Sequence, residues 1–277
     1  MIQTHTADRD DANRGATGGG WAFAATALLA ITGCNNTSGA PTPFNCSPSS
    51  IIGGKVSEPR SLIAGSTVGV RGKNFICSGT LVAPNLVLTA AHCVDRAGLL
   101  VEFGASATCD PAFATRHVTG VRVPDYNEDV DTDRKDVALL KLESPAPEGF
   151  IPAPLVSDEM ERNLGRDTPV ILAGYGQQQV GRPTVTPLDG FLRQTTVGIW
   201  DFNFAQTEFL VYQGDGRGAC YGDSGGPAYL VVDQKYYLLG VASRGDEECR
   251  VNGVYAKVPE FRAWIQSAAR AMDSSLP

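Results

Sequence analysis

Short apolar and β-branched runs, separated by turn-forming residues, follow one another along most of the chain after residue 66. Short strands at this spacing, with no long helical period, predict an all-β protein built as an antiparallel barrel or sandwich. A proline-rich stretch, Ser144–Pro154, divides the runs into two sets. The first set comprises Thr67–Val70, Phe75–Val82, Leu86–Thr89, Leu99–Phe103, His117–Val123 and Val137–Leu142. The second set comprises Val170–Ala173, Phe191–Ile199, Glu208–Tyr212, Pro227–Val232, Tyr236–Ala242 and Gly253–Val258.

The last segment of the chain has a different period. After Pro259, apolar residues recur at the spacing of one helix face, and proline is favoured in the first turn of a helix. These residues are Phe261, Trp264, Ile265, Ala268, Ala269 and Met272. The pattern predicts a C-terminal amphipathic helix that packs on the second set of strands.

The first 50 residues show no strand pattern. Trp21–Ile31 is an apolar run that is too short to span a bilayer but fits the hydrophobic region of a signal peptide. It leads into Ile31-Thr32-Gly33-Cys34, which resembles a bacterial lipobox. We therefore expect residues 1–33 to be a signal peptide and Cys34 to be acylated, with an ordinary signal peptide and an incidental cysteine as the alternative.

Residues 34–50 are rich in Asn, Ser, Thr and Pro, which predicts a flexible tether or propeptide. Acylation of Cys34 would anchor the protein to a membrane, and Asn35 resembles the residue found there in lipoproteins sent to the outer membrane. Seven cysteines in 277 residues also indicate an oxidising compartment. We expect an extracytoplasmic protein, either an outer-membrane lipoprotein or a secreted one.

Charge excludes some functions. The chain carries a net charge of −7 and has no basic run, which argues against nucleic-acid binding. An acidic segment, Asp125–Asp133, lacks the spacing and the central glycine of a calcium-binding loop, so we expect no metal site there.

Three short motifs carry candidate chemistry. Ser224 stands in Gly218–Pro227, where glycines leave the backbone accessible, but a serine needs an adjacent base and an orienting group to act as a nucleophile. His92 follows an apolar run and Asp136 opens another, and these two residues can supply both groups. His92, Asp136 and Ser224 occur in the chain order and local contexts of the chymotrypsin/trypsin-like serine proteases. Residues Ile51–Ala269 closely resemble this family.

The resemblance implies a fold, a mechanism and an activation step. Residues 51–277 would form the protease domain, as two packed six-stranded antiparallel β-barrels, about 51–150 and about 151–272 with the C-terminal helix. Ser224 would be the nucleophile, His92 the general base and Asp136 the residue that orients it. Backbone N–H groups of Gly222 and Ser224 would form the oxyanion hole. An activating protease would free the amine of Ile51 to pair with Asp223, and no cofactor is implied.

The resemblance also implies two disulfides, Cys77–Cys93 and Cys220–Cys249. Once Cys34 is set aside as the lipidation site, Cys46 and Cys109 remain, and we expect them to pair although no motif supports that bridge.

Specificity is less well defined by the sequence. The resemblance places the primary pocket at Gly218, Ser243, Gly245 and Gly253, and Gly218 occupies the position of the acid in trypsin-like members. Such an uncharged pocket favours large apolar or aromatic side chains over Lys or Arg. The acidic residues Asp246–Glu248 could still recruit a basic side chain, or could form a solvated loop. Arg244 also stands where the family usually has tryptophan.

We therefore predict a monomeric, secreted or surface-tethered serine endopeptidase that acts on protein or peptide substrates. The alternative is a catalytically silent homologue that serves as a surface binding module. Loss of His92, Asp136 or Ser224 would favour the alternative, and all three are present.

Overall fold

The computed structural model describes residues 52–58, 61–94, 98–106, 110, 113–176 and 191–277. All of them belong to one compact unit, Phe44–Pro277. The expected signal peptide, tether and lipidation site, the new N-terminus at Ile51 and the Cys46–Cys109 bridge lie outside the described residues.

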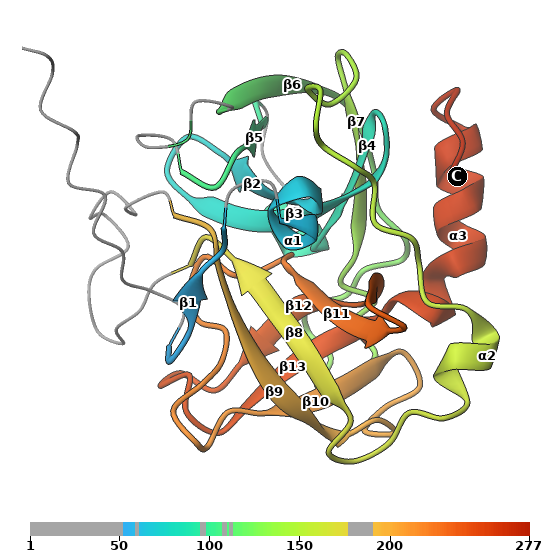
Figure 1. The fold of residues 1–277 in the computed structure, drawn as a ribbon. Coiled ribbons are helices and arrows are strands. Elements are labelled where there is room, and N and C mark those ends of the chain that lie inside the picture. Colours follow the sequence, from blue (N-terminus) through green and yellow to red (C-terminus); the bar gives the residue numbers. More distant parts are fainter. Residues whose placement is uncertain (1–51, 59–60, 95–97, 107–109, 111–112, 177–190) are drawn as a thin grey trace, which may run out of the picture. The chain divides into compact units, whose positions relative to one another are not determined.

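Six strands form a closed antiparallel barrel in the first half of this unit (Figure 1). Their order around the barrel is β2 (Thr67–Arg71), β3 (Ile76–Ala83), β4 (Leu86–Thr89), β7 (Ala138–Leu142), β6 (Ala114–Arg122) and β5 (Leu100–Phe103). Residues Leu86–Leu88 are fully buried, as their unbroken apolar run requires.

The second half forms another closed barrel, since β8 pairs with both β9 and β11. Its strands are β8 (Pro169–Gly174), β9 (Arg193–Asp201), β10 (Glu208–Tyr212), β13 (Asn252–Lys257), β12 (Lys235–Gly245) and β11 (Pro227–Val232). A short strand, β1 (Lys55–Val56), adds to the edge of β9. The prediction of two six-stranded antiparallel barrels is confirmed, and all twelve strands match their predicted positions to within a few residues.

The C-terminal helix α3 (Val258–Arg270) is also confirmed, with Pro259 in its first turn. Its apolar face buries Phe261, Ile265 and Ala268. The helix contacts β12 of the second barrel, as predicted, and also β7 of the first (Figure 1). It therefore helps to hold the two barrels together.

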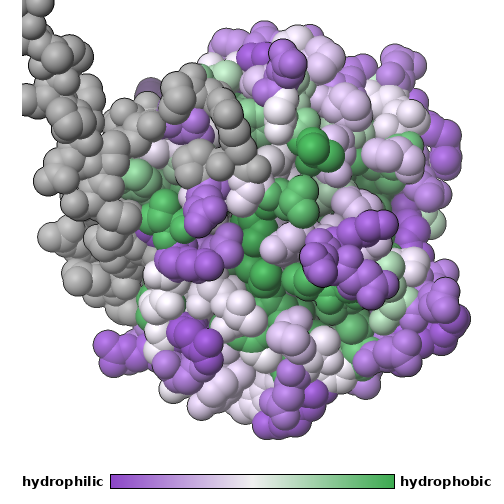
Figure 2. All heavy atoms as spheres, viewed as in Figure 1, coloured by the Kyte–Doolittle hydropathy of each residue, from purple (hydrophilic) through white to green (hydrophobic). Residues whose placement is uncertain are grey.

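Two single-turn helices were not predicted from the sequence. These are α1 (Leu62–Ser66) and α2 (Asp158–Glu161), whose N-terminal N–H groups are capped by the hydroxyls of Ser61 and Ser157. No helix in the described part of the chain is long and apolar enough to cross a membrane. The face in Figure 2 mixes hydrophilic and apolar residues, with hydrophilic ones prevalent at its edge.

Candidate active site

Strand register brings His92 and Asp136 together. β4 and β7 run antiparallel with Thr89 opposite Ala138, so the chain leaves β4 beside the point where it enters β7. His92 lies on a 3₁₀ turn just after β4, and Asp136 lies two residues before β7. Residues 44 positions apart in the chain are therefore neighbours in the fold.

Hydrogen bonds fix this pair. The Nδ1 atom of His92 lies 2.7 Å from Oδ2 of Asp136, and the backbone N–H of His92 donates to Oδ1 at 3.0 Å. Ser243, on β12 of the other barrel, donates its hydroxyl to Oδ2 at 2.7 Å. With Nδ1–H donated to the carboxylate, Nε2 of the neutral ring is left as a proton acceptor.

The pKa of Asp136 is lowered despite its burial. Only 2% of the residue is exposed, and this burial opposes the charged form. The hydrogen bonds and charge of His92, with the hydroxyl of Ser243, outweigh the burial and lower the pKa of Asp136 below its ordinary value.

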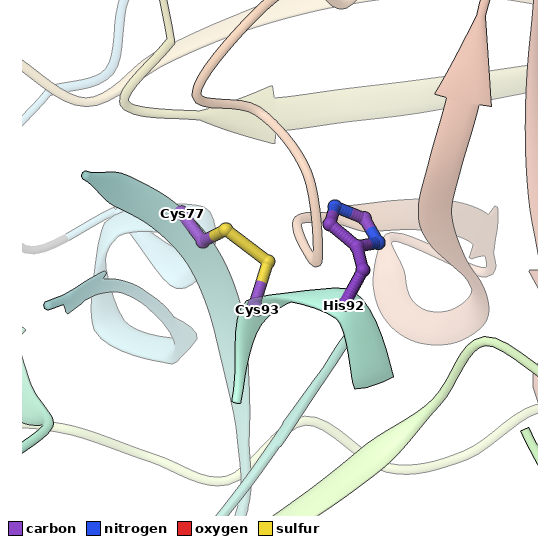
Figure 3. A group of neighbouring side chains, drawn as sticks. All are labelled: Cys77, His92 and Cys93. Carbon is purple, nitrogen blue, oxygen red and sulfur yellow. A yellow bond between two sulfur atoms is a disulfide. The ribbon is translucent and has the colours of Figure 1, made fainter. Parts of the chain in front are cut away.

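A disulfide anchors the histidine turn. Cys77 on β3 bonds to Cys93 beside His92, and Figure 3 shows the bridge next to the imidazole. Among the described residues, these three form the one cluster whose atoms are close enough to share a metal ion. The two sulfur atoms are bonded to each other, so neither can act as a thiolate ligand. The second expected bridge, Cys220–Cys249, is also present.

The loop that carries Ser224 is tied to both barrels. The carbonyl of Ser224 accepts a hydrogen bond from the N–H of Ser78 at 2.7 Å, and Gly225 donates its N–H to the carbonyl of Ala242 at 2.8 Å. Gly225 has φ +79°, and a side chain there would collide with Thr89. Glycine is therefore required at this position.

The backbone N–H groups of Gly222 and Ser224 donate to no acceptor within the described part of the chain. Gly222 is held by its carbonyl, which accepts the hydroxyl of Ser78 at 3.0 Å, and it has φ +95°. Two uncommitted N–H groups beside a serine can stabilise an oxyanion that forms there.

His92 and Ser224 line one cavity of about 500 Å³. Ser243, Gly245 and Gly253 of the expected pocket line the same cavity. Gly218 does not; its N–H instead donates to the carbonyl of Ile52 at 3.1 Å. The side chain of Gln213, which the sequence did not single out, lies at the cavity wall.

Arg244 forms a largely buried ion pair with Glu208, in which 20% of the arginine side chain and 1% of the glutamate side chain are exposed. The guanidinium donates to both carboxylate oxygens, at 2.7 and 2.8 Å, and Glu208 is fully buried at the start of β10. The same carboxylate accepts the backbone N–H of Arg134, and Arg244 donates to the carbonyl of Asp131. The pair thus attaches the segment before Asp136 to the second barrel.

Asp246 accepts hydrogen bonds from the backbone of its own loop. Its carboxylate accepts the backbone N–H groups of Arg250, Val251 and Asn252 at 2.8 to 3.1 Å. Partial burial opposes ionisation of Asp246, but these bonds outweigh it and lower its pKa. Asp246 and Glu247 both line the cavity, whereas Glu248 does not and lies 3.6 Å from Arg250.

Asp223 is buried, with 2% of the residue exposed. Its carboxylate accepts the N–H groups of Gly176 at 2.8 Å and Cys220 at 2.9 Å. Burial dominates over these bonds and the charge of Arg193, and it raises the pKa of Asp223 to about 6. A cation that reached this carboxylate would therefore be strongly favoured.

Two closed antiparallel barrels, with a histidine–aspartate pair and a glycine-flanked serine on one cavity, define the class of chymotrypsin-like serine proteases. The family model described as Trypsin matches residues 51–265. The chain belongs to this family. Family membership implies a hydrolase that acts on proteins, and the two disulfides fit a location outside the cytoplasm.

Proposed function

We propose that the protein is a serine endopeptidase that hydrolyses peptide bonds through an acyl-enzyme on Ser224. The supporting observation is the oriented His92–Asp136 pair on the same cavity as Ser224. The uncommitted N–H groups of Gly222 and Ser224 complete the set of groups that acyl transfer needs.

In this mechanism, Nε2 of His92 takes the proton of the Ser224 hydroxyl as its oxygen attacks the substrate carbonyl. Asp136 stabilises the imidazolium that forms, and the N–H groups of Gly222 and Ser224 bind the oxyanion. His92 then gives its proton to the leaving amine, which departs and leaves the acyl group on Ser224. Water, activated by His92, releases the acid and restores the serine.

Mass spectrometry of a digested peptide library tests this proposal. An endopeptidase will create new internal termini, and their sequences will report the residue preferred before the cut. We propose that this residue is large and uncharged rather than Lys or Arg, because Gln213, Gly245 and Gly253 line the pocket and the carboxylate of Asp246, which also lines it, is hydrogen-bonded within its own loop. The silent binding module would leave every library peptide intact.

We further propose that the enzyme is made as a zymogen. A protease that cuts the Ser50–Ile51 bond would free the amine of Ile51. This amine would pair with Asp223 and order the neighbouring backbone of Gly222 and Ser224. The preceding residues, Cys46-Ser47-Pro48-Ser49-Ser50, contain no Lys or Arg, so the activating protease is not of the trypsin type. The burial and raised pKa of Asp223 support this step, because a lone buried carboxylate gains most from a cationic partner.

The uncut protein should lose stability as pH rises from about 4 to about 6. The pKa of Asp223 lies near 6 in the folded chain, against 3.8 ordinarily, so the folded state keeps a proton that the unfolded state releases. Unfolding free energy should therefore fall across this window and level off above it. Urea unfolding of a Ser224→Ala chain, before and after cleavage at Ile51, measures this.

Cleavage should remove that fall, since the new ammonium group favours the ionised carboxylate and lowers its pKa. Asp223→Asn in the uncut chain is the control and should also abolish it. Equal slopes in cut and uncut protein would show that the amine does not reach Asp223.

The lipidation of Cys34 is a separate proposal about location. Cys34→Ser should move the protein from the membrane fraction to the soluble fraction, because the acyl chains are the only anchor that the sequence offers. Ser47→Ala, in the same tether, is the matched control and should stay with the membrane. If Cys34→Ser still sediments with membranes, the lipobox interpretation is wrong.

A further inference from the structure

The end of β10 places Gln213 at the wall of the cavity. Gln213 directly follows this strand, and it is 1% exposed. Its side chain lines the cavity that contains His92 and Ser224. Its backbone N–H donates to the carbonyl of Val251 at 3.0 Å, which fixes the position from which the side chain projects.

The carboxamide fills space that Gly218 and Gly253 leave empty. A Cβ atom on Gly218 would lie 2.3 Å from Cδ and 2.5 Å from Oε1 of Gln213. A Cβ atom on Gly253 would lie 2.9 Å from the same Oε1. All three distances are shorter than real Cβ contacts. Gln213 therefore occupies the position that a side chain of residue 218 would take in the pocket.

Two hydrogen bonds hold this amide in one orientation. The N–H of Ala219 donates to Oε1 at 2.9 Å, and Nε2 donates to the carbonyl of Ala219 at 3.2 Å. A carboxamide has two N–H donors and an oxygen with two lone pairs. One N–H and one lone pair of Gln213 are therefore uncommitted within the described part of the chain.

We propose that Gln213 forms the floor of the primary specificity pocket and selects tyrosine as the residue before the cleaved bond. A phenol hydroxyl both donates and accepts, so it can pair with both uncommitted groups of the amide. The bare walls at Gly245 and Gly253 admit an aromatic ring. Lysine at the floor would bury its charge against a neutral amide, which is costly. Of the acids that also line the cavity, Asp246 is hydrogen-bonded within its own loop and Glu247 is exposed. This inference rests on the proposed peptidase function.

Four peptides that differ only in that residue, as Tyr, Phe, Leu or Lys, provide the test. The wild-type kcat/KM should favour Tyr over Phe by roughly three- to tenfold, the effect of one or two hydrogen bonds. Gln213→Leu should bring that ratio to about one while Phe is still cleaved. A wild-type ratio near one would overturn the proposal, whatever the variants do.

Gln213→Glu gives a second readout that does not require catalysis. The variant keeps the acceptor for Ala219 and places a carboxylate on the floor, so it should cleave after Lys better than after Phe. It should also bind benzamidine, a flat aromatic cation, at least about tenfold more tightly than the wild type in calorimetry. Gln266→Glu, on the exposed face of α3, adds the same charge far from the cavity and should change neither property.

Unchanged benzamidine affinity in a folded Gln213→Glu protein would show that this side chain is not the floor. If the wild type cleaves no peptide at all, the endopeptidase proposal fails. The benzamidine comparison then still decides where Gln213 lies.

Discussion

Replacing Ser224 or His92 with alanine should reduce kcat by a factor of about 10⁴ to 10⁶ with the fold unchanged, because the proposed mechanism uses the two residues as a unit. Asp136→Asn will cost about 10⁴, since an amide in place of the carboxylate selects the wrong tautomer of His92. The structure supplies the reason: Asp136 accepts Nδ1–H of His92 at 2.7 Å. Steady-state kinetics on the best library peptide, with circular dichroism as a folding check, measures these losses.

His117→Ala is the matched control for these variants. It removes the other histidine of the described chain, which is exposed on β6. Its kcat should equal that of the wild type. Turnover near the wild-type value in Ser224→Ala, or a large loss in His117→Ala, would contradict the assigned roles.

Arg244→Ala should destabilise the protein by about 3 to 5 kcal/mol, the cost of leaving one partner of a buried ion pair uncompensated. Glu208 is fully buried, and without Arg244 its carboxylate would retain, among the described residues, only the backbone N–H of Arg134 as a donor. The segment before Asp136 would also lose its bond from Arg244 to the carbonyl of Asp131. Urea unfolding gives the stability, and kcat should fall as well because Asp136 is less well positioned.

Two controls separate the buried pair from surface charge. Arg217→Ala breaks an exposed pair with Asp215 and should cost less than about 1 kcal/mol. Replacing both buried partners, as Glu208→Leu with Arg244→Met, should cost much less than Arg244→Ala, because no charge is left buried. A small effect of Arg244→Ala alone would show that the pair is not important for stability.

Much of this fold is visible in the local pattern. Runs such as Leu86–Thr89 are apolar and β-branched, and turn residues bound them, so the strands and the helix after Pro259 were predicted close to their observed positions. The pattern left barrel and sandwich open, because strand periodicity does not define which strands pair. The family resemblance around His92, Asp136 and Ser224 predicted two barrels.

The contacts that the sequence did not reveal join polar groups that lie far apart in the chain. Glu208 meets Arg244, which is 36 residues away, and Ser243 meets Asp136, which is 107 residues away. No motif in the neighbouring sequence predicts either contact. Gln213 was missed for a different reason: Gly218 has no side chain and suggested an uncharged pocket, whereas the side chain of Gln213, just after β10, fills the space beside it.

The short helices α1 and α2 were not predicted because the sequence signal for them is too local. Each is a single turn, too short for an apolar period, and each depends on one serine hydroxyl that caps its first N–H groups. Ser61 and Ser157 do resemble capping residues, but without a periodic segment after them the signal is weak.

Labelling with a fluorophosphonate probe tests the central claim most directly. The protein should first be cut so that it begins at Ile51, and then be treated with the probe and digested for peptide mass spectrometry. We predict one probe per molecule, on Ser224, with labelling lost in Ser224→Ala, strongly reduced in His92→Ala, and absent after heat denaturation. No labelling of the cut, folded protein, or labelling of a different serine, would contradict the claim that Ser224 is an activated nucleophile.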